Sequence, residues 1–261
     1  MKAGFILWLE SFGSFIDFVV QTCASVPGAV FRRLGEVVRQ FEHVAVHSVP
    51  IVVGAGLSVG VVAWFQTHRL LVAHGAEATL PSFLAVVVLV EVGPVLAGLM
   101  AAARMGAGLA AELGSMVFNE EIDACVVLGA DPVRTLVTPR AIACALAVPL
   151  LTVVIDASAL LGGLLAEMAA GKASISLFWN RALVFLKLSD VIPATLKTAV
   201  FGLVVGLVAC WTGLNAEPSA EAVGRAATRG VVRSILGVFA ANVIMVPCIQ
   251  FACEAMGWDR L

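Results

Sequence analysis

Side chains that could do chemistry are few in this sequence of 261 residues. The GxSxG pattern of a serine nucleophile is met at Gly56–Gly60 (GLSVG). In hydrolases that pattern sits on a turn between a strand and a helix, whereas here it lies in a long apolar run. Two glycines four residues apart also make a close-packing face for another helix, and Gly202 and Gly206 repeat the spacing. We therefore favour helix packing over a membrane serine hydrolase built on Ser58.

Two carboxylates within apolar runs are the other candidates for chemistry. A carboxylate inside a membrane is costly, so Glu91 is by default a hypothesis for a functional site. Gly93 and Pro94 can open the helix beside it, because proline has no backbone N–H. A structural carboxylate bonded to a neighbouring helix explains Glu91 equally well, and both interpretations stay open. Asp156 would join Glu91 as a proton or cation site in a transporter driven by an ion gradient.

Motifs for ATP hydrolysis and for metal-assisted hydrolysis are absent from the sequence. Gly171-Lys172 is followed by Ala173, so the GxxxxGK[ST] phosphate loop is missing, and no HExxH occurs. None of the six cysteines forms a CxxC pair, and we interpret them as small apolar side chains. The sequence therefore predicts no catalytic residue, no metal site and no cofactor in this chain.

The composition places most of the chain in lipid. Apolar residues make up 61% of it and charged residues 13%, against roughly 45–50% and about 25% in soluble domains. The net charge of −2 and the lack of a basic block argue against nucleic acid as a partner. A bilayer core takes about 20 helical residues. We predict an all-α membrane protein, one domain over 1–261, with spans near 48–67, 80–104, 140–166, 193–213 and 234–254.

The first 40 residues have a different pattern. Apolar residues recur at helical spacing, and a polar stripe lies opposite them at Glu10, Ser14, Asp17 and Gln21. We predict an amphipathic elbow helix at the membrane interface over 1–40, and no signal peptide, because Glu10 and Asp17 interrupt the apolar run. With the N-terminus inside, ten of the 16 Lys and Arg residues fall on inner segments. This excess predicts a cytoplasmic N-terminus and a C-terminus outside.

The segment between the second and third spans is predicted to be a rigid, capped element. An N-cap and an acidic first turn are offered by Asn119, Glu120, Glu121 and Asp123. Gly129 suits the position just past the helix end, which predicts a helix of about ten residues and about 15 Å, too short to span. Asp131 and Pro132 suit the start of the next helix, and Pro139 the start of the third span.

The second inner segment carries a basic stripe. Arg225, Arg229 and Arg233 are spaced four residues apart, and Glu221 precedes Arg225 by four, which is a favourable pairing order. The stripe could contact lipid phosphates or a cytoplasmic partner protein. A solvated face rich in positive charge explains it equally well.

Two long blocks resemble one family. The run EVGPVLAGLMAAARMGAGLAAELGSM, followed by NEEIDACVVLGADPVRTLVTPR, closely resembles the MlaE/YrbE permeases. The later run VGRAATRGVVRS is similar to that family's second cytoplasmic segment, so the resemblance covers nearly the whole chain. These permeases are the membrane subunits of ABC transporters that work with MCE-domain proteins. They move lipids, mainly phospholipids, between the inner membrane and the outer envelope.

The resemblance implies partners and roles for particular residues. It implies a permease homodimer in a bacterial inner membrane, with two ABC ATPase subunits inside that bind ATP and Mg, and an MCE hexamer outside. It places a lipid pocket at Glu91, Gly93, Pro94 and Leu99. It makes 119–138 the coupling region that meets the ATPase, through Glu120, Glu121, Asp123, Leu128, Gly129, Asp131, Pro132 and Arg134. The permease itself would make and break no covalent bond. The rival prediction is a secondary transporter driven by an ion gradient through Glu91.

Overall fold

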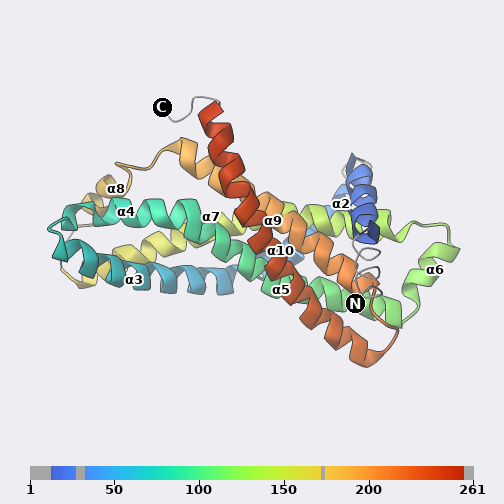
Figure 1. The fold of residues 1–261 in the computed structure, drawn as a ribbon. Coiled ribbons are helices and arrows are strands. Elements are labelled where there is room, and N and C mark those ends of the chain that lie inside the picture. Colours follow the sequence, from blue (N-terminus) through green and yellow to red (C-terminus); the bar gives the residue numbers. More distant parts are fainter. Residues whose placement is uncertain (1–12, 28–32, 172–173, 256–261) are drawn as a thin grey trace, which may run out of the picture. The chain divides into compact units, whose positions relative to one another are not determined.

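A computed structural model describes residues 13–27, 33–171 and 174–255, and every regular element in those ranges is a helix (Figure 1). Residues 13–27 are helical. The longer helices that follow are α2 (Leu34–Val46), α3 (Val49–Ala73), α4 (Leu80–Val87), α5 (Gly93–Phe118), α7 (Thr138–Ala169), α9 (Leu188–Leu214) and α10 (Ala220–Ala255). The short ones are η1 (Glu77–Thr79), η2 (Val88–Val92), α6 (Glu121–Val127), η3 (Val133–Val137) and α8 (Ile175–Ala182). The predicted all-α class is confirmed.

Within the described residues, five helical stretches are long and apolar enough to cross a membrane, as predicted. They are Val49–Ala73, Glu77–Phe118, Val133–Ala169, Leu188–Leu214 and Ala220–Glu254. The fifth begins well before the predicted residue 234, because the Ser219 side chain accepts a hydrogen bond from the Ala222 N–H and starts α10 there. The second inner segment is therefore largely a helix continuous with the last span.

Two π-helical segments precede prolines. In η2 the Gly93 N–H donates to the Val88 carbonyl, and in η3 the Thr138 N–H donates to the Val133 carbonyl. Each donor stands directly before a proline, Pro94 or Pro139, whose missing N–H would break the ordinary α-helical ladder. At Gly93 and Pro94 the ladder is opened by one hydrogen bond, but the π segment carries the helix on into α5. The predicted helix start at Pro139 is wrong, because the π segment carries the helix through that proline without a break.

The chain divides into two compact units, each built from three stretches of sequence. Unit 1 comprises Met1–Val44, Ala101–Leu146 and Gly202–Gly237. In its described part, the helix over 13–27 contacts Trp211 of α9 through Phe15 and Phe18, with ring centroids 5.8 and 5.2 Å from the indole. Gly230 of α10 lies against Gly106 of α5, so two membrane helices meet backbone to backbone there.

Unit 2 comprises Ala45–Met100, Ala147–Phe201 and Val238–Leu261. A core cluster of this unit joins α4, η2, α7 and α8 through Leu84, Val88, Leu160, Leu164 and Phe178. Gly56 and Gly60 press against the α7 backbone near Ile155 and Ala159, where an added Cβ would overlap it. This contact confirms the packing interpretation of that glycine pair.

The predicted elbow over 1–40 is described only in part. Residues 1–12 and 28–32, which include the predicted apolar positions Phe5, Trp8, Leu9 and Phe12, lie outside the described residues. Within the described part, 13–27 and α2 are two separate helical segments. The elbow as a whole stays a prediction.

Candidate functional site

An ion pair in unit 2 joins two membrane-spanning stretches. The Lys197 ammonium of α9 lies 3.1 Å from Glu91 Oε2 of η2, and the same nitrogen donates to the Val90 carbonyl at 3.1 Å. Pro94 has no N–H to offer the carbonyl of Val90, four residues before it, so the lysine supplies the missing donor. The ion pair and the π segment therefore form one local arrangement at the point where the proline interrupts the ladder.

The two partners of this pair differ in exposure. The Lys197 side chain is 3% exposed, whereas 47% of the Glu91 side chain is exposed on the single chain. Gly93 and Pro94 are buried, and Leu99 on α5 is partly buried. Lys197 was not predicted as a site residue. It is the one basic residue within Leu188–Leu214, and a single basic residue in an apolar helix is a signal that could have identified it.

A second carboxylate lies beside the same segment. Asp156 of α7 is buried, and its Oδ1 finds no hydrogen-bond donor among the described residues. A Cβ added to Gly93 would overlap the Asp156 carboxyl group, so the two helices approach this closely only because residue 93 is a glycine. Asp156 therefore contacts the segment that carries Glu91, as an unpaired polar group.

The segment between the second and third spans holds α6, which is seven residues long rather than the predicted ten. Asn119 is not its N-cap, because the Asn119 N–H donates to the Ser115 carbonyl and continues the end of α5. Glu120 takes that place in a left-handed conformation at φ 60°, which turns the chain sharply. Glu121 and Asp123 stand in the first turn, as predicted, where the helix dipole favours negative charge.

The end of α6 and the start of the helix after it are capped as predicted. Gly129 has φ +75°, and the N–H groups of Gly129 and Ala130 donate to the carbonyls of Val126 and Cys125. That pair of bonds is a Schellman motif, which suits a glycine just past the helix end. The Asp131 carboxylate accepts from the Val133 N–H at 3.0 Å, with Pro132 at the first helical position. Arg134 pairs with Asp131 at 3.2 Å on the surface.

Apolar side chains stand exposed at the end of this capped element. Val127 and Leu128 are 86% and 85% exposed, and Val126 is also exposed. Exposed apolar patches are found where a protein contacts another protein or a membrane. The turn between α6 and the third span is capped on both sides, so it is not a loose loop.

The three arginines of the basic stripe lie on α10 and have different surroundings. Arg225 pairs with Glu221 at 2.7 Å and Glu217 at 3.2 Å. Arg233 donates to the Thr212 hydroxyl at 3.4 Å, whereas Arg229 makes no ion pair with any described residue. The stripe is thus partly neutralised at its first position, and its role stays a prediction.

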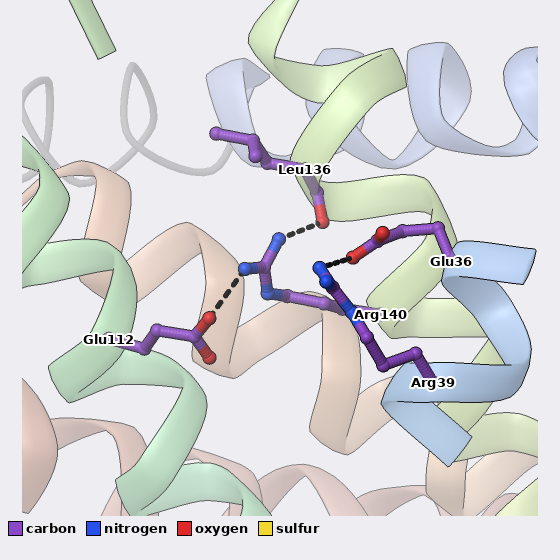
Figure 2. Close-up of polar contacts among 5 residues, drawn as sticks. All are labelled: Glu36, Arg39, Glu112, Leu136 and Arg140. Carbon is purple, nitrogen blue, oxygen red and sulfur yellow. Dashed lines mark hydrogen bonds and ion pairs between the residues drawn. The ribbon is translucent and has the colours of Figure 1, made fainter. Parts of the chain in front are cut away.

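A charged cluster in unit 1 was missed at the sequence level (Figure 2). The buried Arg140 guanidinium of α7 donates to Glu112 of α5 at 2.6 Å and to the Leu136 carbonyl at 2.7 Å. On α2, Arg39 pairs with Glu36 at 2.8 Å. Burial raises the pKa of Glu36, but hydrogen bonds from Arg39 and Gln40 and the charges of Arg39 and Arg140 outweigh it, so the pKa lies below its usual value.

The burial of Arg140 and Lys197 changes the count of Lys and Arg residues from which the orientation in the membrane was predicted. Arg140 was counted on the inner side and Lys197 on the outer side, yet both side chains are buried in ion pairs. Removing them leaves nine inner against five outer residues, so the excess keeps its sign. The orientation of the termini stays a prediction.

An open cavity of about 620 Å³ adjoins the charged cluster, between α2 and α5 of unit 1. Its polar lining consists of Arg39, Gln40, His43, Arg104 and Glu112. The Ser58 hydroxyl, by contrast, donates at 2.8 Å to the Gly54 carbonyl of its own helix, as a serine inside a helix commonly does. Nothing in that geometry activates Ser58 as a nucleophile.

Comparison with known proteins finds one family over most of the chain. The family described as Permease MlaE matches residues 37–247. A probable ABC transporter permease protein of Rickettsia felis is 31% identical over 240 residues, which is 92% of each chain. The intermembrane phospholipid transport system permease protein MlaE of Haemophilus influenzae is 29% identical over 80% of each chain. The chloroplastic protein TRIGALACTOSYLDIACYLGLYCEROL 1 of Arabidopsis thaliana is 32% identical over 79% of this chain and 59% of its own.

Proposed function

This chain belongs to the MlaE permease family, and on that premise we propose that it is the membrane subunit of an ABC transporter for phospholipids or related lipids. In this proposal a separate ATPase drives lipid between a bacterial inner membrane and an MCE-domain protein. The observation that carries it is the Glu91–Lys197 pair, because paired charges within apolar spans mark a polar point on a path through the membrane. The name of the Haemophilus influenzae relative supports phospholipid as the cargo.

The exposed half of Glu91 supports a pocket shared with a second copy of the chain. A carboxylate left facing hydrocarbon is costly, whereas one that faces a pocket between two permeases can meet a polar lipid headgroup. We therefore assign Glu91 and Lys197 to the polar part of a lipid pocket, with Gly93, Pro94 and Leu99 beside them. This assignment agrees with a homodimer as the working unit.

The capped α6 element is the proposed contact with the ATPase. Its acids Glu120, Glu121 and Asp123 and its exposed Leu128 offer both charge and an apolar anchor. Gly129, Asp131, Pro132 and Arg134 form the turn that joins α6 to the third span. When ATP closes the two ATPases, this rigid turn would pass the movement to the spans and change the size of the lipid pocket. The arginines at 225, 229 and 233 would lie on the same cytoplasmic side.

The proposed assembly contains two permeases, two ABC ATPases and an MCE hexamer. ATP and Mg would bind the ATPases and not this chain. The N-terminus would lie in the cytoplasm and the C-terminus in the periplasm, following the excess of Lys and Arg on the inner segments.

An ion-gradient transporter remains the second candidate because of one observation. Asp156 is buried without a hydrogen-bond donor beside the segment that carries Glu91, and such a carboxyl group can take up a proton. Glu91, however, already has a partner within the chain, because Lys197 lies 3.1 Å from it. That pairing favours the ATP-driven candidate for Glu91 itself.

The test is lipid transfer from liposomes that contain the permease with its ATPase and MCE partners. We expect a fluorescent phospholipid to move when ATP is supplied without any ion gradient. Transfer that needs a pH gradient and proceeds without the ATPase would overturn the proposal in favour of the second candidate.

A further inference from the structure

The cavity between α2 and α5 combines a polar lining with an apolar one. Beyond its charged side chains, it is lined by Val44, Met105 and Leu109, all of which are buried. A ligand that matches this lining has a polar head and an apolar portion. All these residues belong to unit 1, whereas Glu91 and Lys197 belong to unit 2.

One cation of the cavity has no counter-ion. Glu112 is paired with Arg140, and Glu36 with Arg39, so these two acids and two arginines balance one another. Arg104 forms neither a hydrogen bond nor an ion pair with any residue that the structure describes. Its side chain is exposed and stands at the end of the predicted span 80–104, where lipid headgroups meet the protein. An exposed arginine at that level can bind a lipid phosphate.

The outer side of α2 indicates where that anion comes from. Leu34, Val38 and Val46 are exposed on one face of α2, and the exposed Glu42 stands among them. A helix whose exposed face mixes apolar and charged side chains is suited to the boundary between headgroups and acyl chains. A cavity beside such a helix is placed where a lipid headgroup can enter it.

We propose that this cavity binds the phosphate headgroup of a membrane lipid, with Arg104 and Arg39 as its donors. Arg39 has donors to spare, because a guanidinium carries five N–H groups and its pairing with Glu36 uses one nitrogen. The buried Val44, Met105 and Leu109 receive the beginning of an acyl chain. The proposal needs neither the ATPase nor transport, so its failure and that of the proposed function are distinguishable.

The test is lipid binding to the full-length permease in an uncharged detergent, followed by native mass spectrometry. Three probes separate the sources of the ligand: phosphatidylglycerol, the diacylglycerol with the same chains, and soluble glycerol phosphate. Arg104→Gln and Arg104→Lys are compared with the wild type. Arg69→Gln is the matched control, because Arg69 is an exposed arginine of α3 away from the cavity.

We expect phosphatidylglycerol to bind the wild type and Arg69→Gln alike. Arg104→Gln should weaken that binding about tenfold, which corresponds to roughly 1.4 kcal/mol for one charge-assisted contact, and Arg104→Lys should restore part of it. Unchanged binding by Arg104→Gln, or an equal loss in Arg69→Gln, would overturn the proposal. If diacylglycerol binds as tightly as phosphatidylglycerol, the cavity recognises acyl chains alone and the proposal is wrong. Equal binding of glycerol phosphate would mean that it takes a soluble phosphate instead of a lipid.

A photoreactive phosphatidylglycerol places the site directly. With the reactive group near the phosphate, cross-linked peptides should come from α2 and from the part of α5 around Arg104. Labelling that leaves both helices untouched would contradict the assignment, whatever the affinities show.

Discussion

Lys197 is the residue whose removal most directly tests the ion pair within the spans. We expect Lys197→Met to destabilise the permease by about 1–3 kcal/mol, because it leaves the Val90 carbonyl without a donor and Glu91 without its cation. The half-exposed Glu91 keeps this figure below that of a fully buried pair. The measurement is thermal unfolding in detergent micelles.

A double-mutant cycle separates the pair from the single side chains. The double variant Glu91→Gln with Lys197→Met should recover part of the lost stability, since it leaves no unpaired charge. Lys187→Met, at an exposed position, serves as the control and should change little. Strictly additive losses in the double variant would show that the two residues do not interact.

The close approach of Gly93 to Asp156 can be tested separately. Gly93→Ala should destabilise the permease by about 1–3 kcal/mol, because its Cβ would overlap the Asp156 carboxyl group. Gly54→Ala is the matched control, since an added Cβ there meets nothing within 4 Å. A loss in Gly93→Ala no larger than in Gly54→Ala would contradict the packing seen here.

Single residues also mark the limit of sequence reasoning. Glu91 was predicted because a carboxylate in an apolar run is conspicuous by itself. Its partner Lys197, 106 residues later, was not, because helical periodicity does not say which spans are neighbours. The same limit hid the pairing of Arg140 with Glu112. Each partner is set by tertiary packing rather than by local sequence.

Among the helices, the capped α6 element gives the sharpest test, because it is the proposed contact with the ATPase. Leu128→Asp should greatly weaken co-purification of the ATPase while leaving the permease folded, because this side chain is exposed and contributes no core packing. Val184→Asp, another exposed apolar residue outside α6, is the control. If both variants retain the ATPase equally, α6 is not the contact.

Local capping chemistry explains which elements the sequence could predict. The caps at Gly129 and Asp131 depend on residues one to five positions apart, so the pattern predicted them correctly. Asn119 was misplaced because α5 runs on to Phe118 and uses that N–H itself. The helix through Pro139 was missed because a π segment can bypass a proline, and no local pattern distinguishes that from a helix start.

At the scale of the whole molecule, composition predicted the membrane class, and the lengths of the apolar runs predicted the five spans. Apolar length decides whether a helix can span a bilayer, and that quantity is read directly from the sequence. The close approaches at Gly56, Gly93 and Gly230 were not predicted as specific contacts, since each depends on which helices face one another.

The number of lipids transferred per ATP hydrolysed in the reconstituted transporter tests the proposed function most directly. We expect Glu91→Gln to lower lipid transfer about tenfold, roughly 1.4 kcal/mol in the barrier, while the ATPase stays bound and active. We also expect Leu128→Asp to lower transfer by losing the ATPase, with Glu91 intact. If Glu91→Gln instead loses ATPase binding and lipid transfer together, Glu91 is structural and the central claim is wrong.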